Sequence, residues 1–305
     1  MNSVDRHPKL FGTQGQSAVD PSLEAVDAIM RTALLESLDR QSPLYEAISY
    51  HMSSGGKKTR AKIALDAGVL LSVNANSVLA IAGCCELLHN ASLIHDDIQD
   101  QDILRRGRPS VWQKYGRDCA ICVGDLFISA AYSVLSAIPS PNHLVELLRQ
   151  THAAITITTA GQASDMAAKS RPLTNMMDYE TIVAQKSGQL LELPLKSVLI
   201  IAGHQKALKT LAQGVRSIAV AYQLLDDLED AEMDQQMGAL NGVNVIRQAG
   251  ISLQPQAHAR SLAETHLDNA IHQFKQLPHP SGMAFSPVIG RLRKSLNLES
   301  AHARP

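Results

Sequence analysis

The stretch of sequence that decides the fold runs from residue 77 to residue 100 and reads SVLAIAGCCELLHNASLIHDDIQD. Its first part is apolar on almost every side of a helix, a pattern typical of a helix buried at the centre of a bundle. Its end carries Asp96, Asp97 and Asp100. Carboxylates at positions i and i+4 share one face of a helix, so this stretch predicts a long central helix with an acidic face at its last turn.

A second acidic cluster, Asp226-Asp227-Leu228-Glu229-Asp230, repeats the first one 130 positions later, again in a helical stretch. A folded protein does not gather so much like charge in one place without a counter-charge. If the two helices face each other, Mg²⁺ is the simplest counter-charge, because it takes oxygen ligands and shares them with substrate phosphates. The pair of clusters therefore predicts an enzyme that handles a diphosphate.

Helix signals extend over the rest of the chain, and alternating strand patterns are absent. We expect an all-α fold, a large single-domain helical bundle with a central active-site cavity lined from facing helices. Residues 20–296 form this domain, and the polar segment 1–19 and the tail 297–305 are expected to be loose. The expected helices, beyond residues 77–100, cover about 21–38, 118–137, 142–168, 175–203, 206–236 and 254–276.

Composition narrows the class of protein. The 305 residues are 45% hydrophobic and 19% charged. The net charge is −1, so the composition does not indicate a basic surface that would bind nucleic acid. We find no signal-peptide pattern and no apolar run long enough for a membrane span, and therefore expect a cytoplasmic protein without stable membrane insertion. Cys119 and Cys122, with Cys84 and Cys85, have spacing compatible with a zinc site, but their apolar helical context favours buried, unreactive core cysteines.

Basic residues precede and follow the first acidic cluster. Residues 55–60 read GGKKTR, and two glycines before a helix let backbone N–H groups converge on an anion, with Lys57 and Arg60 on one face. A flexible turn followed by a solvated basic face explains the same residues. Residues 105–108 read RRGR and place guanidiniums, which bind phosphate in bidentate fashion, next to the carboxylates.

Further motifs follow in a fixed order, and together they carry a resemblance to a known family. Residues 161–165 read GQASD, Lys186-Ser187 follows, and Gln223 leads into the second cluster. With GGKKTR and the first cluster, this order resembles the trans-isoprenyl diphosphate synthases of the polyprenyl synthetase family, over roughly residues 45–250, and most of all the short-motif geranylgeranyl diphosphate synthases. Any one motif can arise by chance, but the whole series in family order does not.

The resemblance implies a reaction and a set of roles. Isopentenyl diphosphate condenses with an allylic diphosphate (dimethylallyl, geranyl or farnesyl), and three Mg²⁺ ions stabilise the departing diphosphate. The implied catalytic residues are Asp96, Asp100, Asp226 and Lys186. The implied metal site consists of Asp96, Asp97, Asp100, Asp226, Asp227 and Asp230. In it, Asp96, Asp100 and Asp226 would bind the ions, and Asp97, Asp227 and Asp230 would tune the clusters and hold metal-bound waters. Arg105, Lys186 and Gln223 would hold the allylic diphosphate, and Lys57, Arg60, His89 and Arg106 would hold isopentenyl diphosphate. Relatives are commonly homodimers, and residues 118–137 offer an apolar face that core packing explains equally well.

Product length is expected to depend on the helix that precedes the first cluster, because the growing tail lies against it. Ala91 and Ser92, five and four residues before Asp96, are small, where an aromatic side chain in related enzymes blocks the tail. Leu88 lies about 12 Å along the helix from Asp96. We therefore expect geranylgeranyl diphosphate, with farnesyl diphosphate or a product of C25 or longer as alternatives.

One departure from the family pattern lies behind the second cluster. The family usually supplies lysines there, but residues 231–250 contain no lysine, only Arg247, with Asn241 and Asn244 in the comparable stretch. The diphosphate clamp is then weaker, uses Arg247, or has changed its role. A class I terpene cyclase and a prenyltransferase acting on a non-isoprenoid acceptor are the alternative classes, although a cyclase does not need the second diphosphate site.

Overall fold

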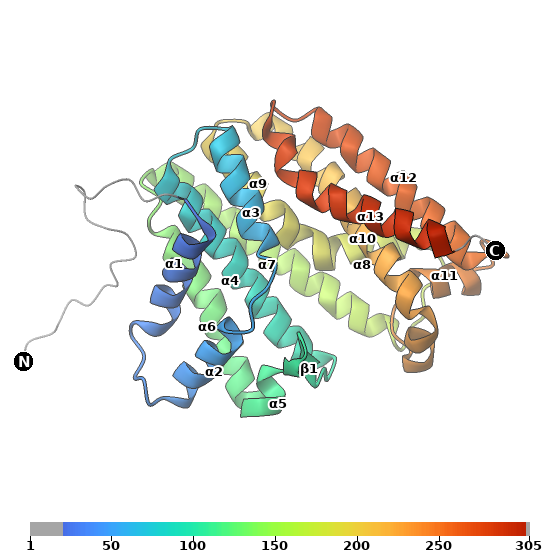
Figure 1. The fold of residues 1–305 in the computed structure, drawn as a ribbon, viewed down its shortest axis with the longest axis horizontal. Helices are drawn as coiled ribbons and strands as arrows, with labels where there is room; N and C mark the ends of the chain where they lie inside the picture. Colours follow the sequence, from blue (N-terminus) through green and yellow to red (C-terminus); the bar gives the residue numbers. More distant parts are fainter. Residues whose placement is uncertain (1–20, 303–305) are drawn as a thin grey trace, which may run out of the picture. The chain divides into compact units, whose positions relative to one another are not determined.

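The structure is a computed structural model that describes residues 21–302, with side chains described through residue 297. Helices make up nearly all of it (Figure 1), and the only strands among the described residues form one short hairpin. The expected all-α class is confirmed. The segment 1–19, expected to be loose, lies outside the described residues.

The described residues form two compact units, which divide between residues 149 and 150, inside helix α7 (Pro141–Ala168). The first unit contains the first acidic cluster and the second unit contains the second. The other elements of the first unit are α1 (Leu23–Leu35), α2 (Pro43–Met52), α3 (Thr59–Leu70), α4 (Ala75–Gln99), β1 (Leu104–Arg105), β2 (Arg108–Pro109), α5 (Val111–Tyr115) and α6 (Arg117–Leu135).

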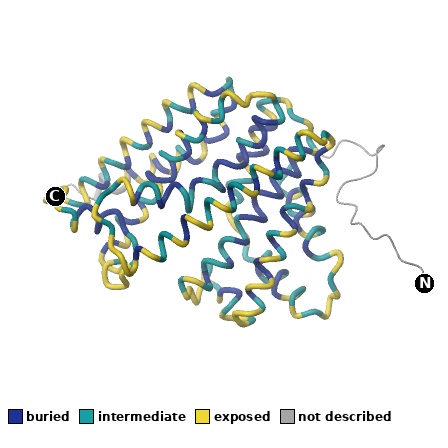
Figure 2. The backbone as a smooth tube through the Cα atoms, turned by 180° about the vertical axis from the view of Figure 1, so that it is seen from behind, coloured by how far each residue is buried: buried dark blue, intermediate teal, exposed yellow. Residues whose placement is uncertain are grey.

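Helix α4 is the core of the first unit and matches the helix expected over residues 77–100. Asn74 caps its first turn by accepting hydrogen bonds from the backbone N–H groups of Asn76 and Ser77 at 3.0 and 3.3 Å. Every residue from Ser77 to Leu88 is buried, because α6, α3 and α1 pack around the helix. Buried positions recur along the inner faces of the helices, and exposed ones gather on outer faces and loops (Figure 2).

Helices α4 and α6 correct one expectation from the sequence. By length and composition, both helices could cross a membrane. The sequence analysis expected no apolar run of that length, and this expectation is wrong. In α4, 78% of the apolar window is buried inside the protein, as in the core helix of a soluble protein, and in α6 the share is 44%. The apolar character of α4 therefore reflects its place in the core.

The cysteines differ in exposure. Cys84 and Cys85 are buried in α4, as expected, and burial raises the pKa of the Cys85 thiol well above its ordinary value. Cys119 is half-buried and Cys122 is exposed, so the expectation of buried cysteines is wrong for this pair. The reason is that α6 turns Ala120, Val123 and Phe127 toward the core and Cys122 toward solvent.

The second unit is organised around α10 (Leu208–Met237), which packs against α12, α11, α9 and the π-helical turn η1. Gly214 brings α10 close to α12, because a Cβ there would lie 2.6 Å from the ring of Phe274. The remaining elements are α8 (Met176–Val183), η1 (Ala184–Gly188), α9 (Gln189–Ile201), η2 (Gln205–Ala207), α11 (Gly242–Gln248), α12 (Pro255–Lys275), η3 (Ser281–Phe285) and α13 (Ser286–His302).

Two features of the second unit differ from the sequence expectations. The helix expected over residues 175–203 is interrupted by the π-helical turn at Ala184–Gly188, a kind of bulge found frequently at functional sites. Helix α13 continues through His302, into the segment expected to be a loose tail, and residues 303–305 lie outside the described part.

Candidate active site

The first acidic cluster forms the last turn of α4. Helix α4 ends at Gln99 and Asp100 is its C-cap, so Asp96 and Asp100 share a face and both are half-buried. Asp97 points elsewhere: its side chain is 2% exposed, and it accepts a hydrogen bond from Arg105 Nε at 2.7 Å and another from Arg105 Nη2. Burial raises the pKa of Asp97, and the Arg105 guanidinium opposes that shift.

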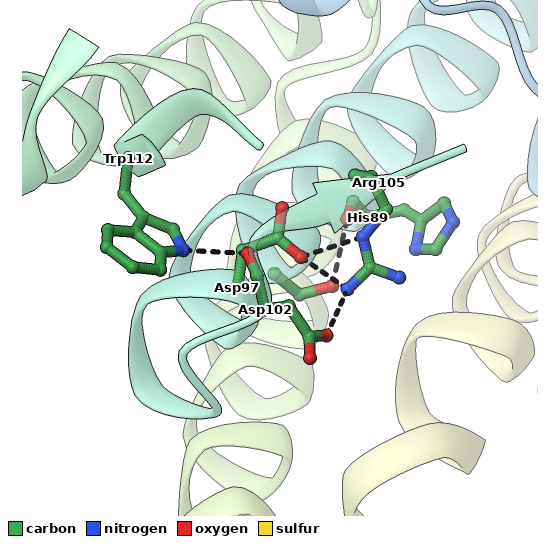
Figure 3. A network of polar contacts seen from close by, with 6 residues as sticks. His89, Asp97, Asp102, Arg105 and Trp112 are labelled. Carbon is green, nitrogen blue, oxygen red and sulfur yellow. Dashed lines mark hydrogen bonds and ion pairs between the residues drawn. The ribbon is translucent and has the colours of Figure 1, made fainter. Parts of the chain in front are cut away.

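The hairpin β1–β2 directs the two predicted arginines, Arg105 and Arg106, to different partners. Its turn residues, Arg106 and Gly107, both have positive φ (55° and 75°), as a tight two-residue hairpin requires. Arg105 reaches back to Asp97 and also to Asp102, whose carboxylate lies 3.1 Å from Nη2 (Figure 3). Asp102 also accepts, at its backbone carbonyl, a hydrogen bond from the Trp112 indole at 2.9 Å. The hairpin is thereby fixed to the end of α4.

Arg106 joins the hairpin to the glycine turn of residues 55–60. Its Nη1 donates to the carbonyl of Gly55 and to Ser54 Oγ, the latter at 3.2 Å. At Gly56 a Cβ would lie 2.8 Å from Arg106 Nη2, and φ is 145°, so only glycine allows this approach. The structure thus brings together two sequence motifs separated by about fifty residues.

The predicted basic residues do not all point to one place. Lys57 is exposed, and Lys58 pairs with Asp27 of α1. His89 lies within electrostatic reach of Arg60, Arg105 and Arg106, and burial followed by these positive charges lowers its pKa well below the ordinary value. His89 is therefore a neutral ring at neutral pH, able to donate one hydrogen bond beside the arginines.

Three residues that the sequence reasoning missed support this basic cluster. Glu86 is 3% exposed and accepts a hydrogen bond from the backbone N–H of Ala61 at 3.0 Å, which anchors the start of α3. His51 Nε2 and Asn90 Oδ1 lie 2.8 Å apart, and burial lowers the pKa of His51 to about 4. A Glu or Asn within an apolar helix is a signal that the sequence offers, because polar groups in such surroundings have hydrogen-bond partners.

The residues expected to set product length lie on α4 as the sequence implied. Leu88 and Ala91 are 3% and 2% exposed. Ser92 is half-buried and donates a hydrogen bond to the carbonyl of His89 at 2.8 Å, so its hydroxyl is satisfied within its own helix. Positions 91 and 92 therefore present little side-chain volume and no unsatisfied polar group.

The second acidic cluster lies on α10 and repeats the division seen in the first. Asp226 and Asp230 are exposed, whereas Asp227 is 2% exposed. Asp227 Oδ1 accepts from Gln223 Nε2 at 2.8 Å, and Oδ2 accepts from the Tyr179 hydroxyl at 2.7 Å and from the backbone N–H of Gly242. Burial raises the pKa of Asp227 to about 6 although these donors lower it.

Asp226 shows how much negative charge this turn concentrates. Its pKa is raised first by desolvation and then by the charges of Asp230, Glu229 and Asp234. No ion pair within the described part of the second unit involves Asp226 or Asp230. The turn therefore favours an added cation.

Lys186 stands on the π-helical turn η1. Its Nζ lies 2.6 Å from Asp165 Oδ2 of α7, so two of the predicted motifs meet here. Gly161 allows the approach, because a Cβ there would lie 2.7 and 2.8 Å from Gln185 Cβ and carbonyl C and closer still to the backbone N of Lys186. Neither amide atom of the buried Gln162 has a hydrogen-bond partner among the described residues.

The polar side chains of the segment that follows the second cluster, residues 231–250, form hydrogen bonds within the fold. Asn241 caps α11, and its Nδ2 donates to the carbonyl of Asp227 at 2.9 Å and to Asp234 Oδ2 at 2.8 Å. Arg247 Nη1 donates to Asn244 Oδ1 at 2.6 Å and to Gln235 Oε1 at 2.8 Å. The side chains that stand where lysines were expected thus brace α11 against α10.

The carboxylates of the two clusters suit Mg²⁺ better than a metal ion that takes all of its ligands from protein side chains. Among the described residues, no group of three or more His, Cys, Asp or Glu side chains converges closely enough to hold an ion. Mg²⁺ needs only one or two carboxylates, because water and substrate phosphates complete its octahedron. Pairs at i and i+4, such as Asp226 with Asp230, offer that donor set.

Comparisons with known proteins identify the family of this chain. A model of the polyprenyl synthetase family matches residues 41–241. The short chain isoprenyl diphosphate synthase of Methanocaldococcus jannaschii is 31% identical over 74% of this chain and 68% of its own length. The geranylgeranyl diphosphate synthase of Methanosarcina mazei is 30% identical over 68% of this chain and 65% of its own length, and the farnesyl diphosphate synthase of Escherichia coli is 31% identical over 79% and 85%. The fold matches a solved geranylgeranyl pyrophosphate synthetase from Geoglobus acetivorans with a TM-score of 0.77, at 22% identity over 90% of this chain and 97% of that one.

Proposed function

The chain belongs to the polyprenyl synthetase family and is a trans-prenyltransferase of the isoprenyl diphosphate synthase class, and we propose that its product is geranylgeranyl diphosphate. The names of the relatives include geranylgeranyl and farnesyl diphosphate synthases, so product length has to be argued from the residues of this chain.

The observation that carries the proposal is the small volume at positions 91 and 92 of α4. Ala91 is buried and Ser92 is half-buried with its hydroxyl satisfied, so neither side chain obstructs an apolar tail lying along the helix. The next large apolar side chain toward the helix start is Leu88, about 12 Å along the helix from Asp96. A growing tail therefore meets no obstruction at positions 91 and 92, where an aromatic side chain would stop it.

The acidic residues orient the allylic diphosphate in this proposal. Asp96 and Asp100 on α4, and Asp226 on α10, would hold Mg²⁺, and Asp97, Asp227 and Asp230 would tune the two clusters. Bound Mg²⁺ supplies Lewis acidity that stabilises negative charge on the departing diphosphate. Arg105, Lys186 and Gln223 hold diphosphate oxygens, with Arg105 positioned by Asp97 and Lys186 by Asp165. The C–O bond of the allylic substrate breaks, and no protein nucleophile is required.

The basic residues of the first unit hold the second substrate. Arg60 and Arg106 both lie within electrostatic reach of His89, and the exposed Lys57 can extend toward the same anion. Neutral His89 contributes a hydrogen bond without adding charge. The double bond of isopentenyl diphosphate then forms the new C–C bond, and the released diphosphate accepts the proton that is lost.

Three further assignments belong to the proposal. We place three Mg²⁺ ions in each active site, the protein in the cytoplasm, and the working form as a homodimer. The homodimer is supported by α6, an apolar helix of which less than half of the apolar window is buried within one chain.

Product analysis tests the proposal directly. The purified chain is incubated with labelled isopentenyl diphosphate, Mg²⁺ and each allylic primer in turn, and the products are separated by chain length. Geranylgeranyl diphosphate is expected from all three primers. Accumulation of farnesyl diphosphate alone would refute the proposed C20 product. A parallel reaction without isopentenyl diphosphate is expected to give nothing, since product there points to a cyclase or another acceptor.

A further inference from the structure

The hairpin β1–β2 has a separate support on each of its two strands. On the first strand, Arg105 is hydrogen-bonded to Asp97 and Asp102, and these bonds fix the strand to the end of α4. The second strand, Arg108–Pro109, lies instead against the end of α2, where its main contact is Tyr50. The two strands can therefore be loosened independently of each other.

Tyr50, in the last turn of α2, contacts the second strand through both its hydroxyl and its ring. The hydroxyl donates a hydrogen bond to the carbonyl of Pro109 at 2.8 Å. The ring centroid lies 4.3 Å from Arg108 Cζ and 3.9 Å from Nζ of Lys114 on α5. Neither cation forms an ion pair with any of the described residues, so the negative face of the ring is the group that attracts them. One aromatic side chain thus joins α2, β2 and α5.

Two neighbouring side chains reinforce this junction. Ser53, the C-cap of α2, donates a hydrogen bond from its hydroxyl to the carbonyl of Tyr50 at 2.7 Å and accepts one from Arg108 Nη1 at 3.1 Å. Tyr115 of α5 packs edge-on against the Tyr50 ring, with the centroids 5.5 Å apart. The end of α2 therefore meets the hairpin and α5 in a compact group of side chains, and Tyr50 contacts each of its members.

Arg106, in the turn of the hairpin, is the residue whose place depends on the second strand. Its Nη1 donates to Ser54 and Gly55, whereas its Nε and Nη2 make no hydrogen bond to any described residue. These two nitrogens form an edge with which a guanidinium binds phosphate oxygens. Only Gly107 separates Arg106 from Arg108, so a shift of the second strand moves that edge.

We propose that Tyr50 is a positioning residue for isopentenyl diphosphate: by holding the second strand of the hairpin against α2, it sets the place of the Arg106 guanidinium. This inference rests on the proposed function, in which Arg106 holds that substrate. Arg105 has its own support in Asp97, so the allylic diphosphate is held independently of Tyr50. Loosening the junction with α2 is therefore expected to weaken the binding of one substrate and not the other.

Steady-state kinetics of three variants of α2 test the proposal. Tyr50→Phe keeps the ring but loses the hydrogen bond to Pro109, and is expected to raise the KM for isopentenyl diphosphate about two- to fivefold. Tyr50→Leu also removes the ring from Arg108 and Lys114, and is expected to raise this KM about tenfold or more. In both variants kcat and the KM for geranyl diphosphate should stay within about twofold. Tyr45→Phe is the matched control with unchanged constants, because the Tyr45 hydroxyl makes no hydrogen bond to the described residues.

A double variant separates positioning from a general loss of structure. If Tyr50 acts through Arg106, Tyr50→Leu has little further effect on the KM for isopentenyl diphosphate once Arg106→Ala is present. A general loosening of the fold would instead add its effect to that of Arg106→Ala.

Fluorescence measures the junction itself without any substrate. Trp112, the only tryptophan of the chain, lies on α5 two residues before Lys114. Acrylamide is therefore expected to quench its emission more strongly in Tyr50→Leu than in the wild type or in Tyr45→Phe.

Three results overturn the proposal: equal rises in the two KM values for Tyr50→Leu, no rise in either, or additivity with Arg106→Ala. Should Tyr50→Leu fail to fold, Tyr50→Phe decides alone, and a KM for isopentenyl diphosphate equal to that of Tyr45→Phe overturns the proposal. A wild-type chain without condensation activity refutes the proposed function instead. Calorimetry with isopentenyl diphosphate then replaces KM, and an unchanged affinity in Tyr50→Leu overturns the positioning role.

Discussion

Replacing Gly161 with alanine is expected to damage the site from a distance, through the π-helical turn that carries Lys186. An alanine Cβ at this position would lie 2.7 Å from Gln185 Cβ and 2.8 Å from the Gln185 carbonyl carbon, and closer still to the backbone N of Lys186. Two of these three atoms belong to the backbone and cannot rotate away. Either α7 or the turn Ala184–Gly188 has to move.

The magnitude follows from two opposing contributions. Glycine to alanine inside a helix ordinarily stabilises a protein by about 0.8–1 kcal/mol. Overpacking a close contact costs about 1–3 kcal/mol, and contact with backbone belongs at the upper end of that range. We therefore expect a net loss of about 1–2 kcal/mol in the free energy of unfolding. Displacement of Lys186 from Asp165, now 2.6 Å from its Nζ, is expected to lower kcat by about tenfold or more.

Gly188 provides the matched control, because it is a helical glycine in the same π-helical turn. A Cβ at Gly188 would lie 3.7 Å from Ala219 Cβ, an ordinary contact. Gly188→Ala is therefore expected to stabilise the protein by about 0.5–1 kcal/mol in urea unfolding monitored by circular dichroism. Equal stability of the two alanine variants would refute the argument, since only the contact with the Lys186 turn distinguishes them.

Three further predictions concern other parts of the site. Ala91→Phe is expected to shorten the product to farnesyl diphosphate without lowering the yield of condensation, and chromatography showing an unchanged product would place the tail elsewhere. The pKa of His51 is about 4 in the folded chain and about 6.5 when unfolded, so its stabilisation is present above pH 6.5 and is lost as the pH falls toward 4. Lowering the pH from 7 to 5 should therefore reduce the free energy of unfolding by about 2 kcal/mol through this residue. His51→Gln should abolish this contribution, which urea titrations of both proteins at the two pH values will measure. Arg247→Ala is expected to lower the free energy of unfolding by about 1 kcal/mol, because the guanidinium is hydrogen-bonded to Asn244 and Gln235. For the same reason, the affinity for diphosphate in the presence of Mg²⁺ should change by less than about twofold. A tenfold loss of affinity in calorimetry would instead show that Arg247 binds the diphosphate.

Periodicity was sufficient to predict the long helices, because each buries a broad apolar face. Helix α4, expected over residues 77–100, spans Ala75–Gln99, and α10, expected over 206–236, spans Leu208–Met237. The short elements were not predicted. Helix α11 has only seven residues, and it is held by Asn241 and by the Gly242 amide on Asp227, contacts that depend on tertiary structure.

The candidate site was predictable in its residue types but not in their orientation. Order along the chain associated Arg105 and Arg106 with phosphate binding. It gave no sign that the hairpin turn would send Arg105 to Asp97 and Arg106 to the Gly55 carbonyl. The π-helical turn that carries Lys186 was also missed. Gly161 of α7 lies against this turn, a tertiary contact that the local sequence does not reveal.

The two acidic clusters have the same spacing but different braces, and the difference has an energetic consequence. Asp97 is paired with a guanidinium, so neutralising it leaves Arg105 with Asp102 as its remaining partner among the ion pairs of the hairpin. Asp227 is held by a hydroxyl, an amide and a backbone N–H, all neutral, and burial therefore raises its pKa to about 6. The oxygen of an asparagine amide can accept from the Tyr179 hydroxyl and the Gly242 N–H, and Gln223 can turn its own amide so that its oxygen accepts from the new NH₂ group. An amide cannot balance a guanidinium. Asp97→Asn should consequently weaken diphosphate binding more than Asp227→Asn, and calorimetry with inorganic diphosphate at saturating Mg²⁺ measures that difference; the reverse order would show that charge pairing does not govern the first cluster.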